Sequence, residues 1–158
     1  MEKRGIATGK NILVFYSNTN TPGRLDATGA FVPEAKAFGR LHQVSAPNLV
    51  GMDCYNKSKA SRRDYVLNTI SQSGTKWDGI FFFGHGWPDG IQFGFNRVHV
   101  SELAARIASC CAIDAKIGLY ACLAAENDER AQDYGNVGPG TDGGFADILR
   151  DELVRDGI

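Results

Sequence analysis

The sequence has no excess of charge of either sign and no long apolar run. Its 158 residues include 17 lysines and arginines against 18 aspartates and glutamates, which gives a formal net charge of −1. A protein that binds nucleic acid through phosphate contacts normally carries a basic excess, so we expect no nucleic-acid partner. The longest strongly apolar run, Ile80 to Phe83, is too short to span a bilayer, so we expect no membrane partner.

Histidine and cysteine are also scarce. The three histidines and four cysteines form no C-x-x-C pair and show no zinc-ligand spacing, so we expect no metal site. No signal-type apolar stretch follows residues 1–5, and we expect a cytoplasmic protein with free thiols. We interpret Cys54, which lies in a polar loop, and Cys110 and Cys111 as structural or incidental cysteines.

The composition that remains is that of one globular domain. Hydrophobic residues make up 43% of the chain and charged residues 22%, an ordinary balance for a folded protein. The length also matches a single domain, so we expect residues 1–158 to form one domain with its own core.

Short apolar runs alternate along the chain with segments of helical periodicity. The patterns predict strands at 11–17, 43–49, 78–83 and 116–120, a small hairpin within 89–100, and helices at 30–42, 57–72, 102–111 and 143–156. Ser101 is the expected N-cap of the third helix, and Thr141 and Asp142 cap the fourth. In the helix over 57–72 the apolar side is expected to hold Tyr65, Val66, Thr69 and Ile70, with the basic cluster Lys57, Lys59, Arg62 and Arg63 on the solvated side.

This alternation predicts an α/β fold, a three-layer α-β-α sandwich with a mostly parallel sheet. The last helix runs into Gly157 and Ile158, a helix stop followed by what resembles the start of another strand. We therefore expect the sheet to be incomplete in this chain, which would be the N-terminal fragment of a longer or processed polypeptide.

Two of the predicted strands end in residues that together suit covalent catalysis. The strand at 78–83 leads to His85, and the strand at 116–120 leads to Cys122. Sites in open parallel sheets form beyond the carboxyl ends of the strands, so neighbouring strands would bring an imidazole base to a thiol nucleophile. The backbone N–H groups of Gly86 and Cys122 would then form an oxyanion hole.

These two segments carry a resemblance to a known group of enzymes. The motifs F-F-F-G-H-G at 81–86 and I-G-L-Y-A-C at 117–122 resemble those of the caspase-like cysteine peptidases, a group that includes caspases, metacaspases, gingipains, legumains, separases and CHAT domains. The resemblance implies a caspase-like fold and a cysteine endopeptidase that acts on a peptide or protein substrate. It implies that Cys122 is the nucleophile and His85 the general acid and base. It further implies a zymogen whose sheet is completed by a C-terminal fragment. It implies that no cofactor is required, and it leaves a calcium requirement open.

Four further residues are candidates for substrate binding. In caspases an arginine after the first strand helps to bind an acidic P1 side chain, and Arg24 stands in that region, whereas Asp26 beside it suits a basic P1 residue. The specificity therefore stays open between these two classes. Trp87 directly follows the His-Gly pair, and Tyr120 precedes Ala121 and Cys122, so both are expected to line the substrate site.

Two other functions remain as alternatives. A non-catalytic caspase-like module would work as an adaptor or sensor through dimerisation or partner capture, and a homodimer is left open in either case. The segment 138–143 matches G-x-G-x-x-G, which would suggest a nucleotide-binding doubly wound domain. That fingerprint needs a strand directly before it, and the nearest predicted strand ends near residue 121, so we interpret the segment as a glycine-rich loop.

Overall fold

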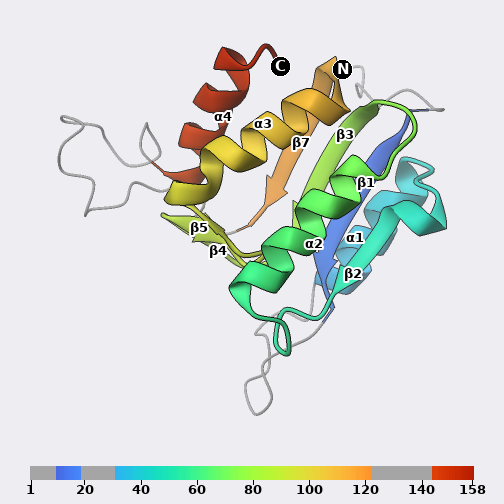
Figure 1. The fold of residues 1–158 in the computed structure, drawn as a ribbon. Helices are drawn as coiled ribbons and strands as arrows, with labels where there is room; N and C mark the ends of the chain where they lie inside the picture. Colours follow the sequence, from blue (N-terminus) through green and yellow to red (C-terminus); the bar gives the residue numbers. More distant parts are fainter. Residues whose placement is uncertain (1–9, 19–30, 122–143) are drawn as a thin grey trace, which may run out of the picture.

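The computed structural model describes residues 10–18, 31–121 and 144–158 (Figure 1). Four parallel strands within this part of the chain form the main sheet, in the order β2-β1-β3-β7. The strands are β1 (Ile12–Ser17), β2 (Leu49–Met52), β3 (Trp77–Phe83) and β7 (Cys111–Tyr120). The prediction of an α/β fold with a parallel sheet is confirmed.

Helices cover both faces of this sheet, as a three-layer arrangement requires (Figure 1). They are α1 (Phe31–Leu41), α2 (Lys59–Ser71), α3 (Val100–Cys110) and α4 (Phe145–Arg155). Alternate residues of β3 point to opposite faces: Phe81 and Phe83 pack towards α1, whereas Ile80 and Phe82 pack towards α2 and α3. Both faces of β3 are therefore buried, which explains its continuous apolar run.

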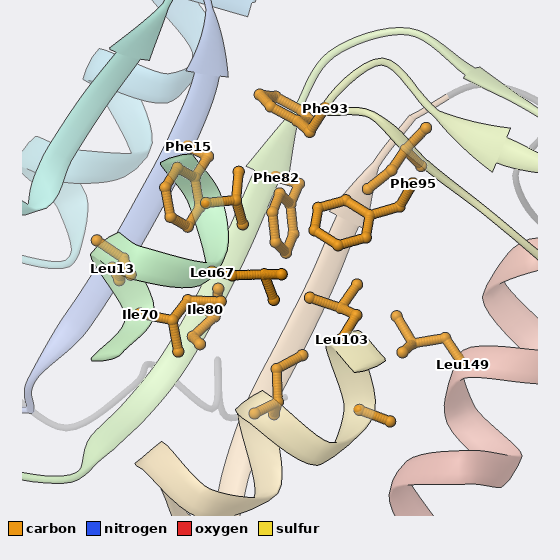
Figure 2. Packing of buried hydrophobic residues seen from close by; sticks show 14 of the residues in the cluster. Leu13, Phe15, Leu67, Ile70, Ile80, Phe82, Phe93, Phe95, Leu103 and Leu149 are labelled. Carbon is orange, nitrogen blue, oxygen red and sulfur yellow. The ribbon is translucent and has the colours of Figure 1, made fainter. Parts of the chain in front are cut away.

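Phenylalanine rings form the centre of the larger core (Figure 2). The ring of Phe82 stacks on Phe15 of β1 with centroids 5.2 Å apart, and Phe93 contacts Phe82 at 5.4 Å. Phe93 belongs to the segment that follows β3, so its ring anchors this segment in the core.

That segment forms a small antiparallel sheet of β4 (Gly86–Trp87), β5 (Gly90–Ile91) and β6 (Phe95–Asn96). The predicted hairpin over 89–100 is thus correct in its first part. Its last residues form instead the 3-10 helix η2 (Arg97–His99) and the start of α3.

The structure corrects the position of the second strand. The residues predicted as a strand at 43–49 include the 3-10 helix η1 (Ala46–Asn48), and β2 begins only at Leu49. The reason is Pro47, which has no N–H group to donate to a ladder and suits the first turn of a helix instead.

Two predicted helix caps are also wrong. Helix α3 begins at Val100 because η2 runs directly into it, so Ser101 lies inside the helix and His99 is the N-cap. The N-cap of α4 is Gly144. The residues predicted for that cap, Thr141 and Asp142, lie outside the described residues, as does the glycine motif at 138–143.

Two predicted environments differ from the observed ones. Tyr65 is 43% exposed and lies under the Lys57 ammonium, while Leu67 is buried in its place, because α2 turns Val66, Leu67 and Ile70 towards the sheet. Cys54, expected in a polar loop, is buried in the core. Its structural role follows from packing.

Strand β7 is longer than the predicted 116–120. It begins at Cys111, which pairs with Trp77, but the next paired residues are Gly79 and Lys116. Residues 112–115 therefore form an irregularity in the ladder. The regularly paired part of β7 coincides with the predicted strand.

Candidate active site

The carboxyl ends of β3 and β7 lie side by side, which is the arrangement on which the His85–Cys122 hypothesis depends. Phe83 is in register with Tyr120, and the Gly84 N–H donates a hydrogen bond of 3.3 Å to the Tyr120 carbonyl oxygen. His85 is the second residue after Phe83, and Cys122 is the second residue after Tyr120. Cys122 itself lies outside the described residues, as do Arg24 and Asp26.

The His85 side chain lies on the face of the sheet that α1 covers. Its ring meets the ring of Phe31, the first residue of α1, edge to face with centroids 4.9 Å apart. Tyr120 is on the same face, because its ring contacts Phe83 and lies 6.1 Å from Phe38 of α1. The imidazole and the end of β7 thus share one side of the sheet.

The backbone of His85 is held from both sides by Gln92. The His85 N–H donates to Gln92 Oε1 at 3.0 Å, and the Gln92 N–H donates to the His85 carbonyl oxygen at 2.9 Å. Sequence reasoning missed Gln92 and Phe31. The signal for Gln92 is the Pro-Asp-Gly turn at 88–90, since a hairpin about that turn places residue 92 opposite residue 85.

The residue that joins β3 to His85 is a glycine because the space beside it is filled. A Cβ atom on Gly84 would lie 2.9 Å from Phe93 Cε2 and 3.1 Å from Gln92 Oε1. Any larger residue there would move either the core phenylalanine or the amide that holds His85.

The Gly86 N–H group is not used in the pairing of β4 with β5. Hydrogen-bonded and non-hydrogen-bonded pairs alternate along an antiparallel ladder. The Gln92 N–H donates to the His85 carbonyl oxygen, which makes the next pair, Gly86 with Ile91, a non-hydrogen-bonded one. The Gly86 N–H therefore points away from β5.

Trp87 lies apart from the His85 imidazole. It is 48% exposed and lines a pocket of about 610 Å³ that also includes residues from the first turns of α2. Since α2 covers the opposite face of the sheet from α1, the structure does not bring Trp87 to the side on which His85 and Tyr120 meet.

Burial makes two cysteines of the described residues, Cys54 and Cys111, poor nucleophiles. Burial raises the pKa of the Cys111 thiol to about 12, with a smaller contribution from Cys110. Burial likewise raises the pKa of Cys54, although hydrogen bonding to Ser17 and the charge of Arg62 oppose the change. Because the thiolate is the nucleophile, neither residue is suited to covalent catalysis.

Residues 10–18, 31–121 and 144–158 contain no cluster of three or more histidine, cysteine or acidic side chains arranged to hold a metal ion. Within the same ranges, every helix is too short or too polar to cross a lipid bilayer.

No family model matches the sequence, and neither a curated protein nor a solved structure shows significant similarity to it. The functional argument therefore depends on the residues and geometry of this chain.

Proposed function

We propose that this chain is a caspase-like cysteine endopeptidase, or the larger part of one, with His85 and Cys122 as its catalytic dyad. The observation that carries the proposal is the register of β3 and β7, which pairs Phe83 with Tyr120 at the carboxyl end of the sheet. In the sequence, His85 follows Phe83 by two residues and Cys122 follows Tyr120 by two residues.

The face of the sheet supports the same assignment. Side chains alternate along a strand, so an extended chain from Tyr120 to Cys122 would return the thiol to the side that Tyr120 occupies. The His85 ring is already on that side, against Phe31.

The chemistry would run in two steps. The Cys122 thiolate attacks the carbonyl carbon of the scissile peptide, and the N–H groups of Gly86 and Cys122 stabilise the resulting oxyanion. The protonated His85 imidazole donates its proton to the leaving amine, which breaks the C–N bond and leaves an acyl-enzyme thioester. His85 then takes a proton from water, whose oxygen attacks the thioester and releases the carboxylate product and Cys122.

The test is cleavage of a fluorogenic peptide library varied at P1, with wild-type protein and the variants Cys122→Ala and His85→Ala. We expect thiol-dependent turnover in the wild type and a loss of at least about a thousandfold in each variant, as for other nucleophile–base pairs. Cys110→Ala, which removes a partly exposed thiol of α3, is the matched control and should retain full turnover.

Retained activity in Cys122→Ala or His85→Ala would contradict the dyad. Circular dichroism checks that both variants are folded, so that a loss of activity can be assigned to the missing side chain. A library without any cleaved peptide, together with a wild-type dimer in sedimentation experiments, would favour the non-catalytic adaptor.

A further inference from the structure

A second candidate site lies beyond the carboxyl end of β3, on the face of the sheet opposite the His85 ring. The pocket of about 610 Å³ is formed by the first turns of α2 and the small sheet β4–β6. Its chemically distinctive lining residues are Lys59, Arg62, Arg63, Trp87, Asp89 and His99. The sequence predicts the basic residues among these to be a solvated helix surface, whereas the structure gathers them around one cavity.

The pocket has an uncompensated positive charge. Three cations line it, against the single carboxylate of Asp89. None of the three forms a salt bridge with any residue in the described ranges. Burial, and then the charge of Arg63, lowers the pKa of His99, although Glu102 acts in the opposite direction.

Two of the cations are held in place by neutral partners. Arg62 Nη1 donates to the carbonyl oxygens of Gln92 at 2.7 Å and Cys54 at 3.1 Å, and Arg63 Nη1 donates to that of Gly94 at 2.9 Å. These bonds fix the guanidinium groups without neutralising them, so an anion would find them preorganised. Arg62 Nε is buried without a hydrogen-bond partner among the described residues, so it contributes no contact to the pocket, and the cavity-facing part of the guanidinium carries its charge.

These three cations lie near the N-terminal end of α2, where a helix usually favours acidic side chains. The first turn of α2 has no acidic residue, although the positive end of the helix dipole favours acidic side chains there. Lys59, Arg62 and Arg63 instead add positive charge to that end. Such an arrangement lowers the stability of the free protein and strengthens the attraction for an anion in the adjacent pocket.

We propose that this pocket binds a small phosphate-bearing ligand with a flat ring, of the nucleotide class. A diphosphate or triphosphate chain carries enough negative charge to match three cations, and guanidinium groups suit phosphate oxygens in geometry. The half-exposed Trp87 ring supplies a surface on which a base can stack. This site is independent of the proposed peptidase activity.

The test is isothermal titration calorimetry of the full chain with pyrophosphate, ATP, adenosine and citrate. We expect binding of pyrophosphate and tighter binding of ATP, with adenosine and citrate at least about tenfold weaker than ATP. Trp87→Leu should weaken the binding of ATP and leave that of pyrophosphate unchanged.

Lys59→Gln is the variant that tests the location, since Lys59 lines the pocket and Gln keeps helix propensity. We expect it to weaken both phosphate ligands at least about fivefold. Lys57→Gln is the matched control, because Lys57 lies over the Tyr65 ring and does not line the pocket.

Absence of heat with both pyrophosphate and ATP at millimolar concentration would overturn the proposal. Equal losses in Lys59→Gln and Lys57→Gln would also overturn it, because they would show attraction to the general surface charge. Citrate binding as tight as that of pyrophosphate would exclude phosphate recognition. Since binding is the readout, none of these results bears on the His85–Cys122 dyad.

Discussion

The phenol ring of Tyr120 lies flat on the ring of Phe83, with centroids 4.4 Å apart and planes at 7°. Each of the two is the last residue of its strand, and they are also partners in the β3–β7 register. The carboxyl ends of these strands are therefore held together by side-chain stacking as well as by the ladder. This contact is adjacent to the segments in which we place the catalytic dyad.

We expect Tyr120→Ala to destabilise the fold and Tyr120→Phe to leave it nearly unchanged. Alanine removes the stacked ring, and aromatic pairs contribute about 0.5–1.5 kcal/mol beyond the area they bury. The free energy of unfolding in urea measures the effect. Ile113→Ala is the control, because Ile113 is in the same strand and is 79% exposed. Equal effects of the two alanine variants would contradict a role for the stack.

A second prediction concerns the amide that holds His85. Gln92→Leu removes the acceptor of the His85 N–H, so we expect a loss of about 1 kcal/mol in the free energy of unfolding. If the peptidase proposal is correct, kcat should fall while KM changes little, because the imidazole is less well positioned. Urea unfolding and peptide cleavage measure the two effects.

Gln72→Leu serves as the control for this variant. Gln72 is the exposed C-cap of α2, and its cap bond to Thr69 uses the backbone N–H, which the substitution keeps. A Gln92→Leu protein as stable and as active as Gln72→Leu would show that the amide does not position His85.

The elements that the sequence predicts well are those defined by local patterns. The apolar runs of β1 and β3 are confirmed nearly to the residue, because strands buried on both faces carry continuous apolar sequence. The adjacency of the strands that precede His85 and Cys122 is only a condition of the sequence hypothesis, and the β3–β7 pairing meets it. The two strong runs can be recognised locally, and a parallel sheet limits how they can be arranged.

The features that the sequence does not predict depend on contacts between distant segments. The pairing of His85 with Gln92 depends on the exact turn, and the basic pocket depends on where α2 packs against residues 87–99. The orientation of α2 likewise depends on tertiary packing, since its periodicity alone is compatible with burial of either Tyr65 or Leu67. Packing against the sheet selects Leu67.

Gly118 is a further residue whose role only the structure shows. A glycine in a strand indicates a close approach without naming the partner. Here the Phe81 ring covers the glycine, so that a Cβ atom on Gly118 would lie 2.8 Å from Phe81 Cε1. We expect Gly118→Ala to destabilise the protein by about 1–3 kcal/mol, because the ring has to move within a packed layer.

Thermal or urea unfolding of Gly118→Ala against Gly74→Ala measures this effect. A Cβ atom on Gly74 would meet nothing within 4 Å, so we expect that control to change the free energy of unfolding by less than about 0.5 kcal/mol. Equal stability of the two variants would mean that Phe81 does not cover Gly118 as described.

The last prediction concerns the alkaline limit of stability. Burial is the main cause that raises the pKa of Cys111 to about 12, from an ordinary value of 9.0. A thiol whose pKa is raised in the folded state stabilises the protein fully below the unfolded pKa, and this contribution is lost as pH rises from about 9 towards 12.

We therefore expect the stability advantage of the wild type over Cys111→Ala to shrink by about 1.4 kcal/mol between about pH 8 and pH 10, since alanine does not titrate. Urea unfolding of both proteins at the two pH values gives the difference, in which the other titrating groups largely cancel. A difference that stays constant with pH would show that the Cys111 thiol titrates alike in the folded and unfolded states, which its burial among Trp77 and the core of the larger cluster argues against.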